Sequence, residues 1–370
     1  MLKFYAGTLA NPTDDPSIPP SVGIYRFEMD PETGSLQNCG LAARANGPSW
    51  VTKYPTLPGI WYAAASSETK SSQNEDVVLA LRQEADGTLS RIGAYPTGGT
   101  DACHISASSD GKFLFVSNYR NATLAFFEVQ PDGSLGGRQT FQLEGRGPNP
   151  VRQAKSYAHF MKTDPTGKFL LACNLGADRI HSFRFFEAEN RWKQAPDFPY
   201  AQSASGSGPR HLVFSPDGRW VYVINELSCT LDTFAWDPEI GSLTLVTSVP
   251  TLPPRFHGLN KGAAIALSKD GKFLYVTNRG ADLITVFQVD TAPVDGSRME
   301  AGVVLDPVQF IPSGGEFPRF GGLDPSGNFF LAANKKSHNI TVFRVDPTNG
   351  TLSRGSSAAI AWCTCIEFSD

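Results

Sequence analysis

A pattern of about ten residues recurs along this chain and constrains the possible folds more than any other feature. Each full copy has a glycine-containing turn, an apolar run and an asparagine, as in Pro216-Asp-Gly-Arg-Trp-Val-Tyr-Val-Ile-Asn225. Ungapped copies stand at 109–118, 165–174, 216–225, 268–278 and 325–334, with a weaker one at 57–66. The turn glycines, at positions 59, 111, 167, 218, 271 and 327, are spaced 51 to 56 residues apart. Such a period is typical of propellers and solenoids, in which each repeat forms one supersecondary unit.

Each repeat contains four segments with the character of β-strands. In the repeat around residue 218, an apolar run at 211–215 precedes the Asp-Gly turn, and a second apolar run follows at 220–224. Asp-Gly turns supply the positive φ that a tight hairpin needs. An alternating strand at 230–236 and a turn at 237–243 then lead to a more polar outer strand. Four antiparallel strands in about 50 residues form a propeller blade.

The first strands of the repeats give the number of blades. They begin near residues 48, 103, 158, 210, 263 and 319, which accounts for six blades. The segments 2–8 and 23–27 at the start of the chain, with 363–368 at its end, supply three strands of a seventh. Chain ends that share one blade close the ring and remove its open edges. We therefore predict an all-β fold, a seven-bladed β-propeller with four-stranded blades, as a single domain over 1–370.

Composition excludes several classes of function. The net charge is −4 with no basic run, which argues against a nucleic-acid partner. No apolar run approaches the roughly 20 residues of a membrane span. The six cysteines lack CxxC spacing and the histidines are dispersed, so we predict no metal site and no cofactor. Because the first residues lack the apolar segment of a signal peptide, we expect a cytoplasmic protein with free thiols.

The repeat also predicts where a functional site would lie. In each blade, the start of the first strand and the end of the second face the same mouth of the central channel. These positions lie eight residues before and eight residues after each turn glycine. The earlier position holds Cys103, His159, Arg210, Ala263 and Arg319, and the later one holds Tyr119, Leu175, Glu226, Arg279 and Lys335. The set is diverse and rich in ionisable groups, which predicts a mouth that binds a small anion.

Four runs of the sequence carry a family resemblance. They lie at 207–218, 224–227, 274–280 and 334–343, and the first reads Ser-Gly-Pro-Arg-His-Leu-Val-Phe-Ser-Pro-Asp-Gly. They resemble the lactonase β-propeller family, which includes bacterial cycloisomerase-type 6-phosphogluconolactonases and fungal 3-carboxy-cis,cis-muconate lactonizing enzymes. The likeness covers essentially the whole chain and is strongest from about 100 to 345. This chain departs from the pattern at Ala263-Ala-Ile265, where relatives commonly carry an acidic residue.

The resemblance implies a catalytic set of His159, Arg210, Glu226 and Arg279, all of which also occupy the repeat frame. His159 is the best candidate for general acid or base, because the usual pKa of histidine lies near neutral pH. The residues leave open whether Glu226 orients that imidazole, activates water or holds an arginine. We expect Arg210 and Arg279 to bind carboxylate or phosphate oxygens and to stabilise an oxyanion.

A second group of residues is expected to contribute to substrate binding: His104, His211, Arg319, Lys335 and His338. His104 and His211 follow their frame positions by one residue, so strand alternation predicts that they point away from the channel. The segments 65–75, 140–156, 196–208 and 250–262 are expected to form mouth loops that determine the substrate.

These observations predict a lactonase that hydrolyses a sugar-acid lactone, such as 6-phosphogluconolactone, at the channel mouth. One alternative is the lactonization of a carboxymuconate by nearly the same groups. Another is a propeller without catalytic activity that serves as a platform for protein interactions. The expected partner is a small anionic substrate, a lactone or carboxylate with or without a phosphate group, rather than a nucleic acid or a membrane.

Overall fold

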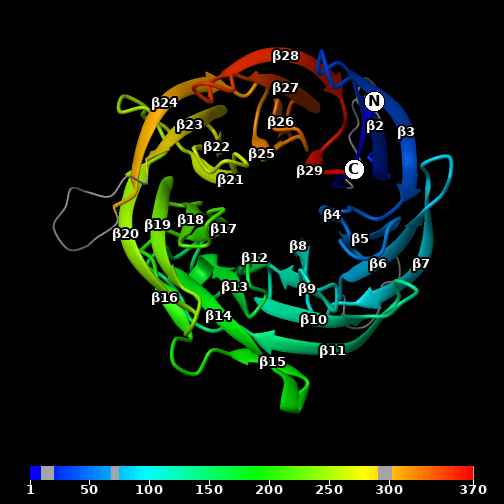
Figure 1. Ribbon diagram of the computed structural model, residues 1–370, viewed down its shortest axis with the longest axis vertical. Coiled ribbons are helices and arrows are strands. Elements are labelled where there is room, and N and C mark those ends of the chain that lie inside the picture. Colours follow the sequence, from blue (N-terminus) through cyan, green and yellow to red (C-terminus); the bar gives the residue numbers. More distant parts are fainter. Residues whose placement is uncertain (10–20, 68–74, 291–301, 370) are drawn as a thin grey trace.

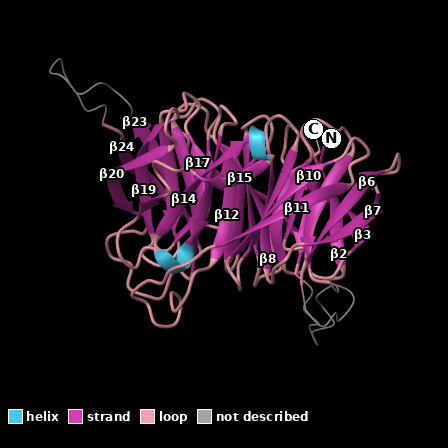
Figure 2. Ribbon diagram, turned by 90° about the horizontal axis from the view of Figure 1, so that it is seen from below, coloured by secondary structure: helices cyan, strands magenta, loops and turns pink. Residues whose placement is uncertain are grey.

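The computed structural model describes residues 1–9, 21–67, 75–290 and 302–369. They form seven β-sheets arranged in a ring around a central channel, which confirms the predicted seven-bladed β-propeller (Figure 1). Seen from the side, the strands stand across the thickness of a flattened ring (Figure 2). Each blade is named here by its innermost strand.

Within each of the following five blades, the strands run in chain order from the innermost to the outermost. The β4 blade has β4 (Trp50–Lys53), β5 (Ile60–Ala65), β6 (Val77–Gln83) and β7 (Leu89–Pro96). The β8 blade has β8 (Ala102–Ala107), β9 (Phe113–Asn118), β10 (Thr123–Val129) and β11 (Leu135–Gln142). The β17 blade has β17 (Pro209–Phe214), β18 (Trp220–Asn225), β19 (Thr230–Asp237) and β20 (Ser242–Pro250). The β21 blade has β21 (Lys261–Leu267), β22 (Phe273–Arg279), β23 (Leu283–Asp290) and β24 (Val304–Pro312). The β25 blade has β25 (Pro318–Leu323), β26 (Phe329–Asn334), β27 (Asn339–Val345) and β28 (Leu352–Ala359).

The β12 blade differs from the others at its outer edge. It contains β12 (Ala158–Thr163), β13 (Phe169–Asn174), β14 (Arg179–Phe186), β15 (Arg191–Gln194) and β16 (Tyr200–Gln202). The short strands β15 and β16 pair with different halves of β14, so this blade has an interrupted fourth strand. The helices are two single 3₁₀ turns, Leu175–Ala177 and Glu187–Glu189. Across the described ranges, no helix is long and apolar enough to cross a lipid bilayer.

The two ends of the chain close the ring, as predicted. The seventh sheet has the order β29-β1-β2-β3, with β29 at Cys363–Phe368, β1 at Leu2–Thr8, β2 at Gly23–Met29 and β3 at Leu36–Arg44. β29 and β1 pair antiparallel from Phe4 opposite Phe368 to Thr8 opposite Cys363. The last strand of the chain is therefore the innermost strand of the blade that holds the first.

The apolar core lies in the spaces between neighbouring blades. One buried cluster, for example, joins Tyr62 and Val78 of the β4 blade to Leu114 and Ala125 of the β8 blade. Similar clusters occupy the other spaces around the ring. Each blade thus buries one face against each neighbour, which lets the fold grow by repetition.

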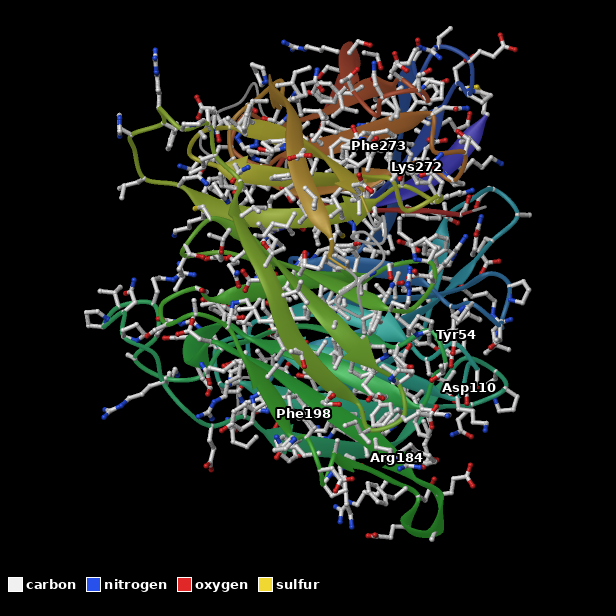
Figure 3. All side chains as sticks on the ribbon, turned by 60° about the vertical axis from the view of Figure 1, so that its left-hand side comes forward. Tyr54, Asp110, Arg184, Phe198, Lys272 and Phe273 are labelled. Carbon is white, nitrogen blue, oxygen red and sulfur yellow. The ribbon has the colours of Figure 1, made fainter. Side chains whose placement is uncertain are left out.

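Glycines in the outer turns fix how closely neighbouring blades approach. The hydroxyls of Tyr5, Tyr62 and Tyr275 donate hydrogen bonds to the carbonyls of Gly87, Gly133 and Gly350, each in the outer turn of the next blade. Gly350 has a positive φ of 69°, and a Cβ atom there would collide with the ring of Phe273. Figure 3 labels Phe273 on the ribbon. Glycine is required at such a position by conformation and by space.

Candidate active site

The inner strands deliver their mouth residues through β-bulges. In β8, β12, β17 and β25, one extra residue interrupts the pairing with the second strand: Cys103, His159, Arg210 and Arg319, respectively. In β21 the bulge contains Ala263 and Ala264. A bulge leaves its extra residue unpaired and re-aims the local side chains, which is why bulges often lie beside active sites. The frame position eight residues before each turn glycine is therefore the bulge position.

The second strands end in buried asparagines that fix the next residue. Asn278 donates to the carbonyl of Thr251, and Asn334 donates to the carbonyl of Ser313. These amides tie the end of the second strand to the connection between blades, and Arg279 and Lys335 follow directly. The asparagine of the sequence repeat is thus structural, and the residue after it reaches the mouth.

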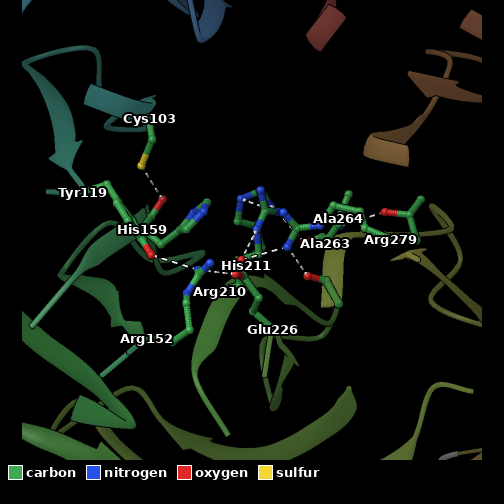
Figure 4. A network of polar contacts seen from close by, with 12 residues as sticks. Cys103, Tyr119, Arg152, His159, Arg210, His211, Glu226, Ala263, Ala264 and Arg279 are labelled. Carbon is green, nitrogen blue, oxygen red and sulfur yellow. Dashed lines mark hydrogen bonds and ion pairs between the residues drawn. The ribbon is translucent and has the colours of Figure 1, made fainter. Parts of the chain in front are cut away.

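Three arginines surround the carboxylate of Glu226 (Figure 4). Nη2 of Arg279 lies 2.8 Å from Oε2, and Nε of Arg210 lies 3.3 Å from the same oxygen. Nη2 of Arg152 lies 2.5 Å from Oε1. Burial raises the pKa of Glu226, but Arg279, Arg210 and Arg152 outweigh it and lower the pKa to about 2. Glu226 is therefore ionised at neutral pH and holds the arginines in place.

Backbone and ring contacts fix the two buried arginines further. Arg279 donates to the carbonyl of Gly262 over 2.7 Å, and its guanidinium lies over the ring of Phe317. Arg210 bonds to the carbonyl of Ala263, and its Nη1 is 3.1 Å from Nε2 of His211. In the run Ala263-Ala-Ile265, Arg210 thus meets a backbone oxygen.

His159 is buried beside this cluster, and its imidazole is neutral. Its ring centroid lies 5.6 Å from that of Tyr119 and 5.1 Å from that of His211. Burial lowers its pKa well below 6.5, and the charges of Arg210, Arg319 and Arg279 lower it further. Within the described residues, Nδ1 of His159 has no hydrogen-bond partner. Tyr119 connects the ring to the carboxylate, because its hydroxyl accepts a hydrogen bond from Arg152, which pairs with Glu226.

Further cations stand around the same mouth without a carboxylate of their own. Among the described residues, the guanidinium of Arg319 has neither an ion pair nor a hydrogen bond, and burial and Arg279 lower its pKa. Burial, then Arg319 and Arg279, lowers the pKa of Lys335 to about 8, and its Nζ lies 5.1 Å above the ring of Trp362. Burial and Arg152 also lower the pKa of Lys261. Positive charge thus exceeds negative charge at this mouth, although the whole chain is acidic.

The expectation that His104 and His211 point away from the channel is wrong. The His104 ring lies 4.5 Å from Trp50 and 3.9 Å from Phe160, and the His211 ring lies 5.8 Å from Trp50. Trp50 and His211 belong to blades on different sides of the ring, so these side chains meet inside the channel. Each histidine follows a bulged residue, where simple alternation of side chains fails. With Phe320, they form an aromatic plug directly beneath the mouth.

His338 lies on the turn between β26 and β27, with a positive φ of 56°. Its Nδ1 accepts a hydrogen bond from the backbone N–H of Trp362, and the two rings are 4.9 Å apart. It therefore helps to position Trp362, whose ring lies beneath Nζ of Lys335.

Arg152 is the main site residue that sequence reasoning missed. It lies in the expected mouth loop 140–156, where Asn149 Oδ1 accepts hydrogen bonds from the backbone N–H groups of Val151 and Arg152. Gln153 anchors this loop by donating to Leu175 and Asp178. These anchors are distant in sequence, so no local motif marked Arg152. Residues 68–74 of the expected loop 65–75 lie outside the described residues.

The ring and its cationic mouth define a seven-bladed propeller with a buried acid–arginine–histidine cluster at one end of its channel. The model of the family described as "Lactonase, 7-bladed beta-propeller" matches residues 3–368, and the chain belongs to this family.

Individual relatives agree with this assignment over nearly their whole length. The chain is 28% identical to a 6-phosphogluconolactonase of Bacillus subtilis over 350 residues, covering 94% of this chain and 95% of the relative. It is 30% identical to a 6-phosphogluconolactonase of Formosa agariphila over 339 residues, covering 90% and 92%. The solved structure of a periplasmic gluconolactonase of Pseudomonas aeruginosa superimposes with a TM-score of 0.87 at 29% identity, covering 99% and 98%.

Proposed function

We propose that this chain is an enzyme that hydrolyses a phosphorylated sugar-acid lactone, 6-phosphogluconolactone or a close analogue, at the cationic mouth. The observation that carries the proposal is the charge around Glu226. One carboxylate faces three guanidiniums, while Arg319, Lys335 and Lys261 add positive charge. A site of this kind favours a substrate with two negative charges, and two relatives are named 6-phosphogluconolactonases.

The phosphate is assigned to the side of the mouth formed by Arg319 and Lys335. These cations lack a carboxylate partner within the described chain, so binding a phosphate there breaks no existing ion pair. Arg210 and Arg279 are already fixed by Glu226 and by backbone carbonyls, which suits them to a charge that develops during the reaction. Preorganised donors of this kind stabilise an oxyanion without moving.

Hydrolysis requires water to add to the lactone carbonyl and the ring C–O bond to break. In the proposed mechanism, neutral His159 accepts a proton from the attacking water, and the carbonyl oxygen becomes an oxyanion stabilised by Arg210 and Arg279. The tetrahedral intermediate collapses, and the imidazolium returns the proton to the leaving ring oxygen. The product carries a hydroxyl and a carboxylic acid, which ionises in water.

Substrate binding would also adjust the basicity of His159. In the free protein, burial and three arginine charges hold the pKa of this histidine well below 6.5. A phosphate dianion among those cations offsets their charge, so the pKa of His159 rises when substrate is bound. A better base is then present at the moment when it is needed.

The direct test is a substrate panel with the purified chain. Hydrolysis of 6-phosphogluconolactone and of glucono-1,5-lactone is followed as acid release above the spontaneous rate. Loss of a carboxymuconate is followed by ultraviolet absorbance. We expect acceleration on the phosphorylated lactone to exceed that on the unphosphorylated one. Faster turnover of the carboxymuconate would favour the cyclisation alternative. If none of the three compounds reacts faster with the protein than without it, the enzyme proposal fails and the platform for protein interactions is the remaining hypothesis.

A cytoplasmic location is part of the proposal. All six cysteines are free, and five of them are buried, which suits a reducing compartment. One relative is described as periplasmic, so location varies within the family. Fractionation of cells that produce the full chain, with a cytoplasmic and an exported marker protein, tests this part.

A further inference from the structure

A cavity occupies the end of the channel opposite the cationic mouth. All seven inner strands contribute to its wall, and its volume is about 360 Å³. Its inner end is formed by the aromatic plug that contains Trp50, Phe160 and Phe320. His104 and His211, which the sequence analysis expected to bind substrate, line it, whereas none of the residues proposed above for catalysis or phosphate binding does. This cavity, called the vestibule here, has the volume of a small-molecule site.

Two opposite charges line the vestibule without pairing. Lys162 lies on β12 and Glu367 on β29, and these strands stand on opposite sides of the ring (Figure 1). Neither side chain forms an ion pair with any described residue. Glu367 has a backbone hydrogen bond from Lys53, whose ammonium lies 3.4 Å from the carbonyl of Ser369. An unpaired ammonium and an unpaired carboxyl therefore face one cavity from two sides.

The other residues that line the vestibule differ in polarity: some are aromatic and others are polar. The aromatic rings of Trp50, Phe160 and Phe320 provide apolar surface at the plug. Thr52 and Ser106 also line the wall, each two residues farther along its strand than Trp50 and His104. A complementary molecule would have an apolar body for the plug and both a positive and a negative group for the two charges.

We propose that the vestibule is a second ligand site, which binds a small zwitterion with an apolar body, such as an apolar α-amino acid. The carboxylate of the ligand pairs with the ammonium of Lys162, and its ammonium pairs with the carboxylate of Glu367. The apolar body packs on Trp50, Phe160 and Phe320. This proposal does not depend on the lactonase function.

The protonation behaviour of the two side chains agrees with this arrangement. Burial raises the pKa of Glu367 to about 7, and Lys53 and Lys162 offset that only in part. The side chain of Lys162 is exposed where it lines the vestibule, and Glu367 is the carboxyl that acts to raise the pKa of this lysine. Each group lacks a sufficient opposite charge, and the bound zwitterion would supply one to both.

The test measures binding of three probes to the full chain by isothermal titration calorimetry at pH 8. L-Phenylalanine carries both charges, 2-phenylethylamine lacks the carboxylate, and 3-phenylpropionate lacks the ammonium. We expect saturable binding of L-phenylalanine and at least about tenfold weaker binding of the other two, since a charged hydrogen bond contributes that much.

Two variants assign the charges. Lys162→Met should weaken the binding of L-phenylalanine about tenfold. The affinity for 2-phenylethylamine should not change, because this probe has no carboxylate that could pair with Lys162. Glu367→Gln should weaken the binding of L-phenylalanine and leave the affinity for 3-phenylpropionate unchanged. Lys168→Met, at an exposed lysine outside the vestibule, is the matched control and should bind all three probes as the parent does.

Several results would overturn the proposal. It fails if no probe binds saturably, if both variants weaken all three probes equally, or if neither variant affects L-phenylalanine. It also fails if 6-phosphogluconate displaces L-phenylalanine by competition, because that result would place the amino acid at the mouth above the plug.

Discussion

Nη2 of Arg279 lies 2.8 Å from Oε2 of Glu226, although the two residues belong to neighbouring blades, Arg279 at the end of β22 and Glu226 directly after β18. Both side chains are almost wholly buried, with 4% and 3% of their surface exposed. Arg152 reaches the same carboxylate from the loop before the β12 blade. One carboxylate thus holds together groups from three parts of the ring, and a buried charge that loses its partner is costly.

Glu226→Gln should lower the free energy of unfolding at pH 7 by about 3–5 kcal/mol, because it leaves three guanidiniums without their counter-charge. Urea unfolding followed by tryptophan fluorescence measures this. Glu239→Gln is the matched control: its side chain is 79% exposed and lies 3.8 Å from Lys168. That change should stay within about 0.5 kcal/mol. Equal effects of the two substitutions would contradict the role given to Glu226.

The stability contributed by Glu226 should be lost in acid. Burial alone would raise the pKa of Glu226, but Arg279, Arg210 and Arg152 outweigh it and lower the pKa from a usual 4.5 to about 2. A carboxyl with a lowered pKa stabilises the fold fully above its unfolded pKa, and this stability is lost as pH falls through the folded pKa. The stability difference between the parent and Glu226→Gln should therefore be constant above pH 5 and shrink between about pH 4.5 and 2. A constant difference over that range would show that ionisation of Glu226 is not its source.

His159→Gln should reduce kcat for 6-phosphogluconolactone by about 10²- to 10⁴-fold with little change in KM, as expected for loss of a proton-transfer group. The pH profile separates this from a structural effect. In the free enzyme the pKa of His159 lies well below 6.5, so kcat/KM should not fall in acid until well below that pH. Bound phosphate raises the pKa, so kcat should fall at a higher pH. His159→Gln should abolish the decrease in acid of both kcat/KM and kcat. If the variant keeps both decreases, His159 is not the base.

Arg319→Met should remove the preference for a phosphorylated substrate. The guanidinium forms no ion pair or hydrogen bond with a described residue, so its loss removes no such bond within the protein. We expect kcat/KM for 6-phosphogluconolactone to fall about 100-fold, consistent with two charged hydrogen bonds, and that for glucono-1,5-lactone to change less than about threefold. Arg219→Met, at an exposed arginine paired with Asp217, is the control and should alter neither substrate. An equal loss of kcat/KM for both lactones would show that Arg319 does not bind the phosphate.

Gly350→Ala should destabilise the fold more than Gly59→Ala. Both residues have a positive φ, 69° and 77°, so an alanine strains the backbone at each. Only at Gly350 would the new methyl group meet the ring of Phe273, whereas the space around Gly59 is open within 4 Å. Urea unfolding should show a loss of about 1 kcal/mol for Gly59→Ala and about 1–3 kcal/mol more for Gly350→Ala, the usual cost of overpacking. Equal losses would mean that blade packing tolerates the added group.

The blades were predictable because the features that define them are local and repeated. Asp217-Gly218 and its counterparts mark the inner hairpins, and the segment 363–368 has no partner except the start of the chain. The set of mouth residues followed from the same arithmetic, since Arg210 lies eight residues before Gly218 and Glu226 eight residues after it.

Side-chain direction was harder to predict, because it depends on bulges that the sequence does not mark. Alternation along β8 and β17 directs His104 and His211 outward, but the bulges at Cys103 and Arg210 direct them into the channel. Arg152 depends on a loop anchored by Asp178, a contact between residues distant in sequence. The split outer edge of the β12 blade likewise has no counterpart in the repeat.

Because β29 pairs with β1, the ring can close only after residues 363–368 have been synthesised. Six blades can assemble while the chain is still being made, yet the N-terminal strand must wait for residues 363–368 to leave the ribosome. Until then an unprotected strand edge remains available to other chains, a known route to aggregation. Without residues 363–368, β1 would therefore keep an unpaired edge and the ring would stay open.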